Sequence, residues 1–212
     1  MKPDNETQKR TAYRILTERL VLRCWSPEDA PVLREALDAC DAHLRPMIPF
    51  MKAEPRSLQQ TAEWLRGHRA AFDLRQMYRY AVFDKQEQNL LGENMLLARV
   101  APGGLEIGYW THKDAIGKGI ATEATCAMIR VAFEIEKLER LEIMCAPENA
   151  ASASIPARLG FTHEATLKKR ARDSEGGTRD LMVWSLFAED YPATPAIGVA
   201  FRAFDCMGKF IT

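Results

Sequence analysis

Three strand-like segments lie close together in the middle of the chain, and they limit the possible folds more than any other feature. Residues 78–85, 90–100 and 104–112 are largely apolar, and only short polar or glycine-rich turns separate them. Parallel neighbours would need a crossover connection of roughly a dozen residues or more. The segments are therefore predicted to form an antiparallel meander, which does not fit a fold built from repeating strand–helix–strand units.

Helical and strand patterns on both sides of the meander complete the predicted secondary structure. Ser26 can cap a helix over 26–39, with Pro27 at its first position and Asp29 in its first turn. Further helices are predicted at 57–74, from the end of the loop that contains Gly117 and Gly119 to about 136, and at 149–160. Further strands are predicted at 19–25, 140–147, 162–172 and 180–187. This order predicts an α+β fold, in which helices flank a mixed, mainly antiparallel sheet.

The composition argues against several classes of function. Lys+Arg and Asp+Glu each number 29, so the net charge is zero and neither nucleic-acid nor anionic-membrane binding is predicted. The five cysteines form no CxxC pair, so we expect reduced thiols and no metal site. The N-terminus lacks the apolar region of a signal peptide, and no apolar run approaches the roughly 18 residues of a membrane span. A cytoplasmic location is the resulting prediction.

The length of 212 residues suits one sizeable domain with extensions. Residues 1–12 are polar and are predicted to form a flexible tail. Residues 13–189 are predicted to form the domain. Residues 190–212 form a C-terminal extension that is apolar in patches and shows no clear period.

Gly117, Lys118 and Gly119 lie between the last strand of the meander and a predicted helix. Free N–H groups in a first helical turn, together with the positive end of the helix dipole, can bind an anion, and glycines let a ligand approach the main chain. The spacing does not match a P-loop, and the antiparallel strands before the loop do not suit a dinucleotide-binding unit. Taken alone, the loop fits either a pyrophosphate site for coenzyme A or a tight turn without a ligand.

Four segments in order carry a family resemblance. The glycine loop reads GKGIATEA over 117–124, LEIGYWTH (105–112) leads into it, IMCAPENAASASIPARLGF (143–161) follows, and RDLMVWSL (179–186) closes the series. Together they resemble the GNAT superfamily of N-acetyltransferases, whose loop has the form Q/R-x-x-G-x-G/A, and within it the RimJ/RimL-like group. The resemblance covers about residues 14–189.

The resemblance implies transfer of an acetyl group from acetyl-CoA to a primary amine, by direct attack in a ternary complex. It also implies a splay between the strands at 104–112 and 140–147, where the coenzyme arm lies. The residues implied in coenzyme binding are Tyr109, Trp110, Thr111, Gly117, Lys118, Gly119, Ile120, Ala121, Thr122, Asn149 and Ser152.

Two positions depart from the superfamily pattern. The first residue of the loop motif is Ile116, so a side-chain contact to phosphate is lost, although main-chain donors can still bind it. Pro156 stands where many members carry a tyrosine that acts as general acid, so no such tyrosine is predicted here.

Acetyl transfer from a thioester needs a neutral amine, a polarised carbonyl and a stabilised thiolate. Ser152 is the candidate donor to the leaving sulfur, and Asn149 either contacts the coenzyme arm or caps its helix. Cys145 either faces the coenzyme sulfur or is an inert buried thiol. Glu106 and Glu93, on neighbouring strands, are candidate bases for the amine proton; the alternative for each is a solvated strand carboxylate.

The lack of an obvious base bears on the acceptor. An α-amine has a pKa of about 7.7–8.0 against about 10.4 for lysine, so far more of it is neutral at neutral pH. Weak base machinery therefore suits a protein N-terminal α-amine, which the RimJ/RimL-like resemblance favours, and equally a small-molecule amine of lowered pKa. A non-catalytic acyl-CoA sensor or scaffold, and a different acyl group, remain alternatives. A homodimer is compatible with all of them.

Overall fold

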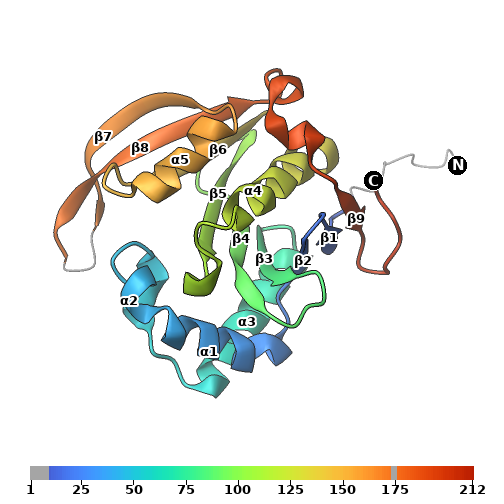
Figure 1. The fold of residues 1–212 in the computed structure, drawn as a ribbon, viewed down its shortest axis with the longest axis vertical. Helices are drawn as coiled ribbons and strands as arrows, with labels where there is room; N and C mark the ends of the chain where they lie inside the picture. The colour runs from blue at the N-terminus through green and yellow to red at the C-terminus, as the bar shows by residue number, and fades with distance from the viewer. Residues whose placement is uncertain (1–9, 173–175) are drawn as a thin grey trace, which may run out of the picture.

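The predicted meander forms the centre of the sheet. The computed structural model describes residues 10–172 and 176–212. Strands β3 (Met77–Asp84), β4 (Leu90–Leu97) and β5 (Gly104–Thr111) pair with one another in antiparallel fashion, which confirms the prediction (Figure 1).

Six further strands extend this meander on both sides. One side carries β2 (Leu20–Cys24), β1 (Arg14–Leu16) and β9 (Arg202–Phe204), and the other carries β6 (Arg140–Cys145), β8 (Thr178–Phe187) and β7 (Thr162–Arg172). Among the described residues the sheet therefore has nine strands, in the order β7-β8-β6-β5-β4-β3-β2-β1-β9. The pair β5–β6 is parallel and the other pairs are antiparallel, so the sheet is mixed and mainly antiparallel, as predicted.

Helices cover both faces of this sheet. They are α1 (Ala30–Ala39), α2 (Asp41–Leu44), α3 (Leu58–Asp73), α4 (Ile120–Arg130) and α5 (Ala150–Arg158), and a π-helical turn (Val131–Ile135) extends α4. Ser26 caps a 3₁₀ turn (Pro27–Asp29) that precedes α1, and Ser26 N donates in return to Asp29 Oδ2 at 2.8 Å. No helix within the described ranges is both long enough and apolar enough to cross a membrane.

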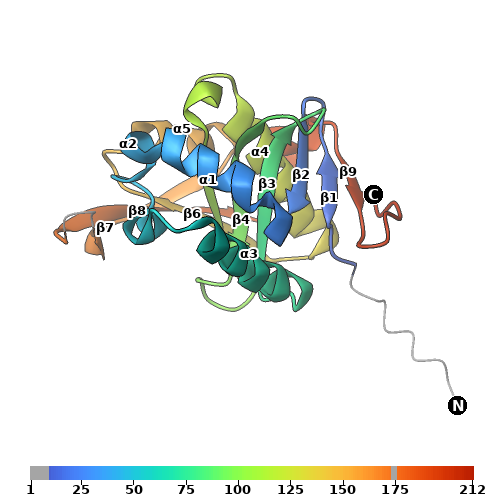
Figure 2. The same cartoon turned by 90° about the horizontal axis from the view of Figure 1, so that it is seen from below.

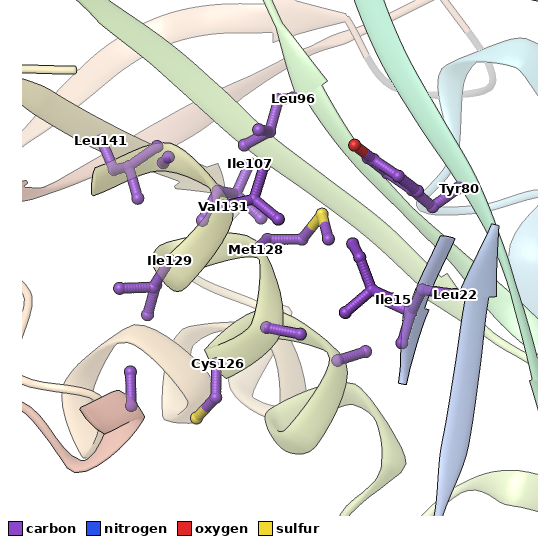
Figure 3. Packing of buried hydrophobic residues seen from close by; sticks show 14 of the residues in the cluster. Ile15, Leu22, Tyr80, Leu96, Ile107, Cys126, Met128, Ile129, Val131 and Leu141 are labelled. Atoms are coloured by element: carbon purple, nitrogen blue, oxygen red, sulfur yellow. The ribbon is translucent and has the colours of Figure 1, made fainter. Parts of the chain in front are cut away.

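The alternation of side chains in the strands divides the core between the two faces. In β2, Leu20 and Leu22 belong to the cluster that packs under α4, whereas Val21 belongs to the cluster under α1 and α3. Figure 3 shows Met128 and Val131 of the α4 segment close to Ile107 of β5. Figure 2, turned by 90°, shows β1 and β9 at one end of the sheet and β7 and β8 at the other.

The segments predicted as extensions of the domain contribute to its fold. Residues 1–9 of the predicted tail lie outside the described residues, but Ala12 is fully buried and its carbonyl accepts a hydrogen bond from Tyr80 Oη at 2.8 Å. In the C-terminal segment, β9 pairs with β1, and Ile211 N and Ala203 O are 2.8 Å apart. Tyr191 packs against Phe133 beyond α4. Residues 190–212 therefore continue the sheet and the core.

Candidate active site

The sheet opens between β5 and β6. These strands pair only over Gly104–Glu106 and Arg140–Glu142. Beyond that point β5 stays paired with β4, and β6 stays paired with β8. The carboxyl-terminal halves of β5 and β6 therefore diverge, which confirms the splay predicted between these two segments.

Main-chain groups of β5 face this opening. His112 N donates to Leu91 O of β4 at 2.8 Å, and main-chain groups of successive strand residues point alternately to the two neighbouring strands. The N–H of Trp110 is therefore directed at β4, and those of Tyr109 and Thr111 at the opening. Tyr109 and Thr111, two of the three strand residues predicted to bind the coenzyme, therefore direct their N–H groups into the opening. Trp110 is buried, and its indole Nε1 donates to Glu93 Oε2 at 3.0 Å.

A cavity of about 540 Å³ occupies the opening. Several residues predicted from the sequence line it together, namely Glu106, Tyr109, Cys145, Asn149 and Ser152. The cavity continues past Glu106 between the loop at 47–50 and the hairpin of β7 and β8. It thus joins the opening between the strands to the space beside the hairpin, which suits two substrates that meet.

Three of the lining residues form a connected group. Tyr109 Oη lies 3.1 Å from the Ser152 hydroxyl and donates to the Ser152 carbonyl at 3.1 Å. Asn149 caps α5 by accepting from Ser152 N at 3.1 Å, so its predicted capping role is confirmed. Burial raises the pKa of Tyr109, against a lowering contribution from Ser152, and keeps its hydroxyl protonated at neutral pH. Burial also raises the pKa of Cys145, which therefore remains a thiol.

Glu106 is the carboxylate that faces this cavity. Its side chain is 13% exposed, and Arg99 Nη1 lies 4.0 Å from Oε1. Burial raises the pKa of Glu106; Arg99 lowers it and Glu142 raises it further. A carboxylate with a raised pKa that borders the cavity can accept a proton from an amine there.

Glu93 has different surroundings. Its two oxygens accept hydrogen bonds from Trp25 Nε1 at 2.7 Å, from Trp110 Nε1 at 3.0 Å, and from Arg79 Nε and Nη2 at 2.7 and 2.6 Å. The side chain is 3% exposed, and it does not line the 540 Å³ cavity. Because four donors occupy the carboxylate, it can hold the packing of β3, β4 and β5 in place, but it has no free position for a substrate proton.

The glycine loop begins helix α4 as predicted. Gly117 and Gly119 have φ angles of 73° and 76°, in the left-handed region that favours glycine. Gly119 is the N-cap of α4, and no side chain caps the first turn. The N–H groups of that turn, from Ile120 to Thr122, can therefore bind an anion. This local geometry is what the sequence pattern predicted.

Two arginines beside the loop were not predicted. Arg19, in the turn between β1 and β2, donates to Lys118 O at 3.0 Å and to Glu123 Oε2 at 2.7 Å. Arg158 of α5 donates to Thr122 Oγ1 at 3.2 Å. Both contacts join distant parts of the chain, so no local motif could indicate them. They place positive charge next to a loop whose own motif residue, Ile116, is apolar.

Within residues 10–172 and 176–212, no three His, Cys, Asp or Glu side chains lie together in a way that could hold a metal ion.

Comparisons with known proteins agree with this geometry. The family described as an acetyltransferase (GNAT) domain matches residues 19–162. The chain is 30% identical over 186 residues to the putative ribosomal N-acetyltransferase YdaF of Bacillus subtilis (strain 168). The matched stretch covers 83% of this chain and 95% of the relative.

Solved structures share the fold. The ribosomal L7/L12 α-N-protein acetyltransferase RimL, in complex with coenzyme A, superposes with a TM-score of 0.74 at 21% identity and covers 81% of this chain and 95% of its own. The microcin C7 self-immunity acetyltransferase MccE, in complex with acetyl-CoA and AMP, has a TM-score of 0.73 at 20% identity, with 80% and 93% covered. The family match and the splayed sheet lead to one conclusion: this chain belongs to the GNAT acetyltransferase family and is an acyltransferase.

Proposed function

We propose that the protein transfers the acetyl group of acetyl-CoA to the α-amine of a protein N-terminus. The observation that carries the proposal is the opening between β5 and β6, where main-chain donors, a hydroxyl pair and the carboxylate of Glu106 border one cavity. The similarity to a relative named as a putative ribosomal N-acetyltransferase supports the choice of acceptor. A cytoplasmic location is part of the same proposal.

The coenzyme would occupy the opening and the glycine loop. Its pyrophosphate would accept hydrogen bonds from N–H groups between Gly117 and Thr122, at the positive end of α4. Its arm would run along the splayed edge of β5, where the N–H groups of Tyr109 and Thr111 are directed. Asn149, whose side chain caps α5, would lie beside that arm.

Each step of the chemistry then has a candidate group. The N–H groups of β5 would polarise the thioester carbonyl and stabilise the oxyanion that forms on it. Glu106 would take the proton of the attacking amine, directly or through water. The Ser152 hydroxyl, backed by Tyr109 Oη at 3.1 Å, would donate to the departing thiolate. No step needs Glu93.

The central experiment measures thiol release from acetyl-CoA with a panel of peptides and small amines, and identifies the acetylated product by mass spectrometry. We expect release with peptides that carry a free α-amine and none with peptides whose N-terminus is blocked. Release with small amines alone would replace the proposed acceptor. Tight coenzyme binding without release from any acceptor would support a sensor or scaffold instead.

A substitution in the loop tests the coenzyme site separately. Gly119→Asp puts bulk and negative charge at a left-handed N-cap facing the phosphates, so we expect calorimetry to show at least about tenfold weaker binding of coenzyme A. Lys118→Ala should have a smaller effect, because the main chain supplies most donors. Gly67→Asp is a matched control, since an added Cβ there meets nothing within 4 Å on the exposed side of α3. Unchanged affinity in the Gly119 variant would remove the proposed phosphate site.

A further inference from the structure

The part of the cavity beyond the opening is rich in positive charge. Beyond the opening, its walls come from the loop at 47–50, from β3 and β4, and from the β7–β8 hairpin. Among the residues that the structure describes, one acidic side chain lines the cavity, Glu106, against five cationic ones: Lys52, Arg79, Arg99, Arg172 and Arg179. Burial and the nearby Arg79 lower the pKa of His68, also in this wall, to about 4, so it is neutral at physiological pH.

Some of these cations are already balanced within the protein. Arg79 pairs with Glu93 through two hydrogen bonds. Arg99 is the cation nearest to Glu106, at 4.0 Å. These two arginines are therefore paired with carboxylates of the protein, and the hairpin contributes two further cations.

Arg172 and Arg179 of the hairpin lack such compensation. Among the described residues, neither forms an ion pair with a carboxylate. Arg172 donates to Gly176 O at 3.2 Å, and Arg179 donates to Pro46 O and Met47 O at 3.2 and 3.3 Å. In addition, Nε of Arg179 is buried without a hydrogen-bond partner. Arg179 also contacts Met47 Sδ at 3.7 Å and is partly buried, so water screens its charge less than that of Arg172, which is exposed. A guanidinium group without a carboxylate partner attracts an anion.

The charges of the cavity are therefore arranged along its length. The carboxylate of Glu106 lies where the strands begin to diverge, and the uncompensated guanidinium groups lie on the hairpin. An acceptor that presents an amine at one end and a negative group further along would match both. A neutral or cationic acceptor would leave the hairpin arginines unpaired.

We propose that the acceptor bears a carboxylate close to its reactive amine, and that Arg172 and Arg179 bind that carboxylate. This inference rests on the proposed amine acetylation and narrows its substrate class. The carboxylate can belong to an acidic side chain that follows a protein N-terminus, or to a free amino acid. The planar guanidinium group of Arg179, which lines the cavity, suits a planar carboxylate in either case.

The test compares matched acceptors. Three peptides share a first residue, length and amidated C-terminus, and carry at positions two to four either aspartate and glutamate, or asparagine and glutamine, or lysine. Free aspartate and glutamate form a fourth arm. We expect kcat/KM for the acidic peptide to exceed that for its amide counterpart by about tenfold at low salt, and the preference to shrink at high salt.

Variants show whether the hairpin is responsible. Arg172→Gln should bring the ratio between acidic and amide peptides close to one, and Arg172→Glu should shift the preference towards the lysine peptide. A merely structural role of Arg172 would not reverse the preference. Arg202→Gln on β9, at the opposite end of the sheet, is the matched control and should keep the ratio of the unaltered protein. Arg179→Gln should act like Arg172→Gln, with Tm measured in parallel because Arg179 also holds the loop at 46–47.

The outcomes separate the two proposals. Acetylation of all peptides at similar rates would overturn the inference and leave the proposed function intact. No acetylation of any peptide or amine would contradict the proposed function itself. Preferential acetylation of free aspartate or glutamate would support carboxylate recognition and identify a small molecule as its source.

Discussion

Glu93 on β4 and Glu106 on β5 are both carboxylates in the central strands, but they face different surroundings. Glu93 lies on the side covered by α1 and α3, where two indoles and one guanidinium occupy its oxygens. Glu106 lies where β5 leaves β6, and its nearest cation is 4.0 Å away. A fully bonded carboxylate stabilises the fold, whereas a desolvated carboxylate beside a cavity can exchange a proton. The number of hydrogen bonds that each carboxylate accepts, and its contact with the cavity, therefore decide which glutamate can act as a base.

The largest effect is expected for Glu93→Gln. The amide cannot accept from all four donors, and it leaves the charge of Arg79 buried without its partner. We expect a loss of about 3–5 kcal/mol in the free energy of unfolding, and a fall in Tm of roughly 10 °C, by thermal or urea denaturation. Glu63→Gln, at an exposed ion pair with Arg66, is the control and should cost less than about 1 kcal/mol. A stable Glu93 variant with a pH-dependent loss of kcat would instead make Glu93 the base.

The next effect is on turnover. Glu106→Gln removes the proposed base, so kcat should fall by about a hundredfold near pH 6.5. The loss should shrink as the pH rises through the α-amine pKa of about 7.7–8.0, because the nucleophile is then already neutral. A pH–rate profile measures this. Glu35→Gln, at an exposed position of α1 that does not line the cavity, is the control. A loss by the same factor at every pH would mark Glu106 as a positioning residue.

A smaller effect is expected at the thioester. Ser152→Ala removes the hydroxyl that lies 3.1 Å from Tyr109 Oη, and we expect kcat to fall by about three- to tenfold. The KM for acetyl-CoA should change little, since the hydroxyl acts as the thiolate forms. Ser154→Ala is the matched control, because that hydroxyl donates within α5 to Ala151 O at 2.8 Å. An effect of Ser152→Ala on KM alone would assign this hydroxyl to coenzyme binding.

The smallest expected effect concerns stability, and its sign is opposite to that at Glu93. Burial raises the pKa of Glu106, so the folded state favours the protonated form. The stability from that form is present below the ordinary pKa of about 4.3 and is lost as the pH rises through the raised value. Glu106→Gln should therefore raise Tm slightly at pH 7 and have no effect near pH 3.5. Scanning fluorimetry across this range measures it. A lower Tm at pH 7 would show that pairing with Arg99 outweighs burial.

Local sequence signals were sufficient for much of the fold and for part of the site. Short turns predicted the meander, and the loop at Gly117 and Gly119 predicted that a helix starts directly after it. The family resemblance was needed to predict the splay between β5 and β6, because the local sequence does not show where two strands stop pairing. By contrast, β1 and β9 have three residues each, too few to show a strand period, and they form only through pairing with each other and β2.

The parts of the site that were missed depend on contacts between distant residues. Glu93 and Glu106 occupy similar sequence surroundings, and only the packing of Trp25 and Arg79 distinguishes them. Tyr109 was predicted to bind the coenzyme, but the contact of its hydroxyl with Ser152, 43 positions away, was not predicted. Such contacts follow from tertiary packing, which neither spacing nor composition encodes.

The contact of Arg19 with the glycine loop links coenzyme binding to the edge of the sheet. Arg19 and Thr17 both bond Glu123 of α4, and they lie in the turn after β1, which β9 holds from its other side. Fraying of β9 would free β1, loosen this turn and so disturb the first turn of α4. Because linkage is reciprocal, a bound coenzyme would in return slow the opening of the edge strands. Binding of the coenzyme would then increase the protection of backbone amides against hydrogen exchange both in the glycine loop and in β1 and β9 at the edge of the sheet.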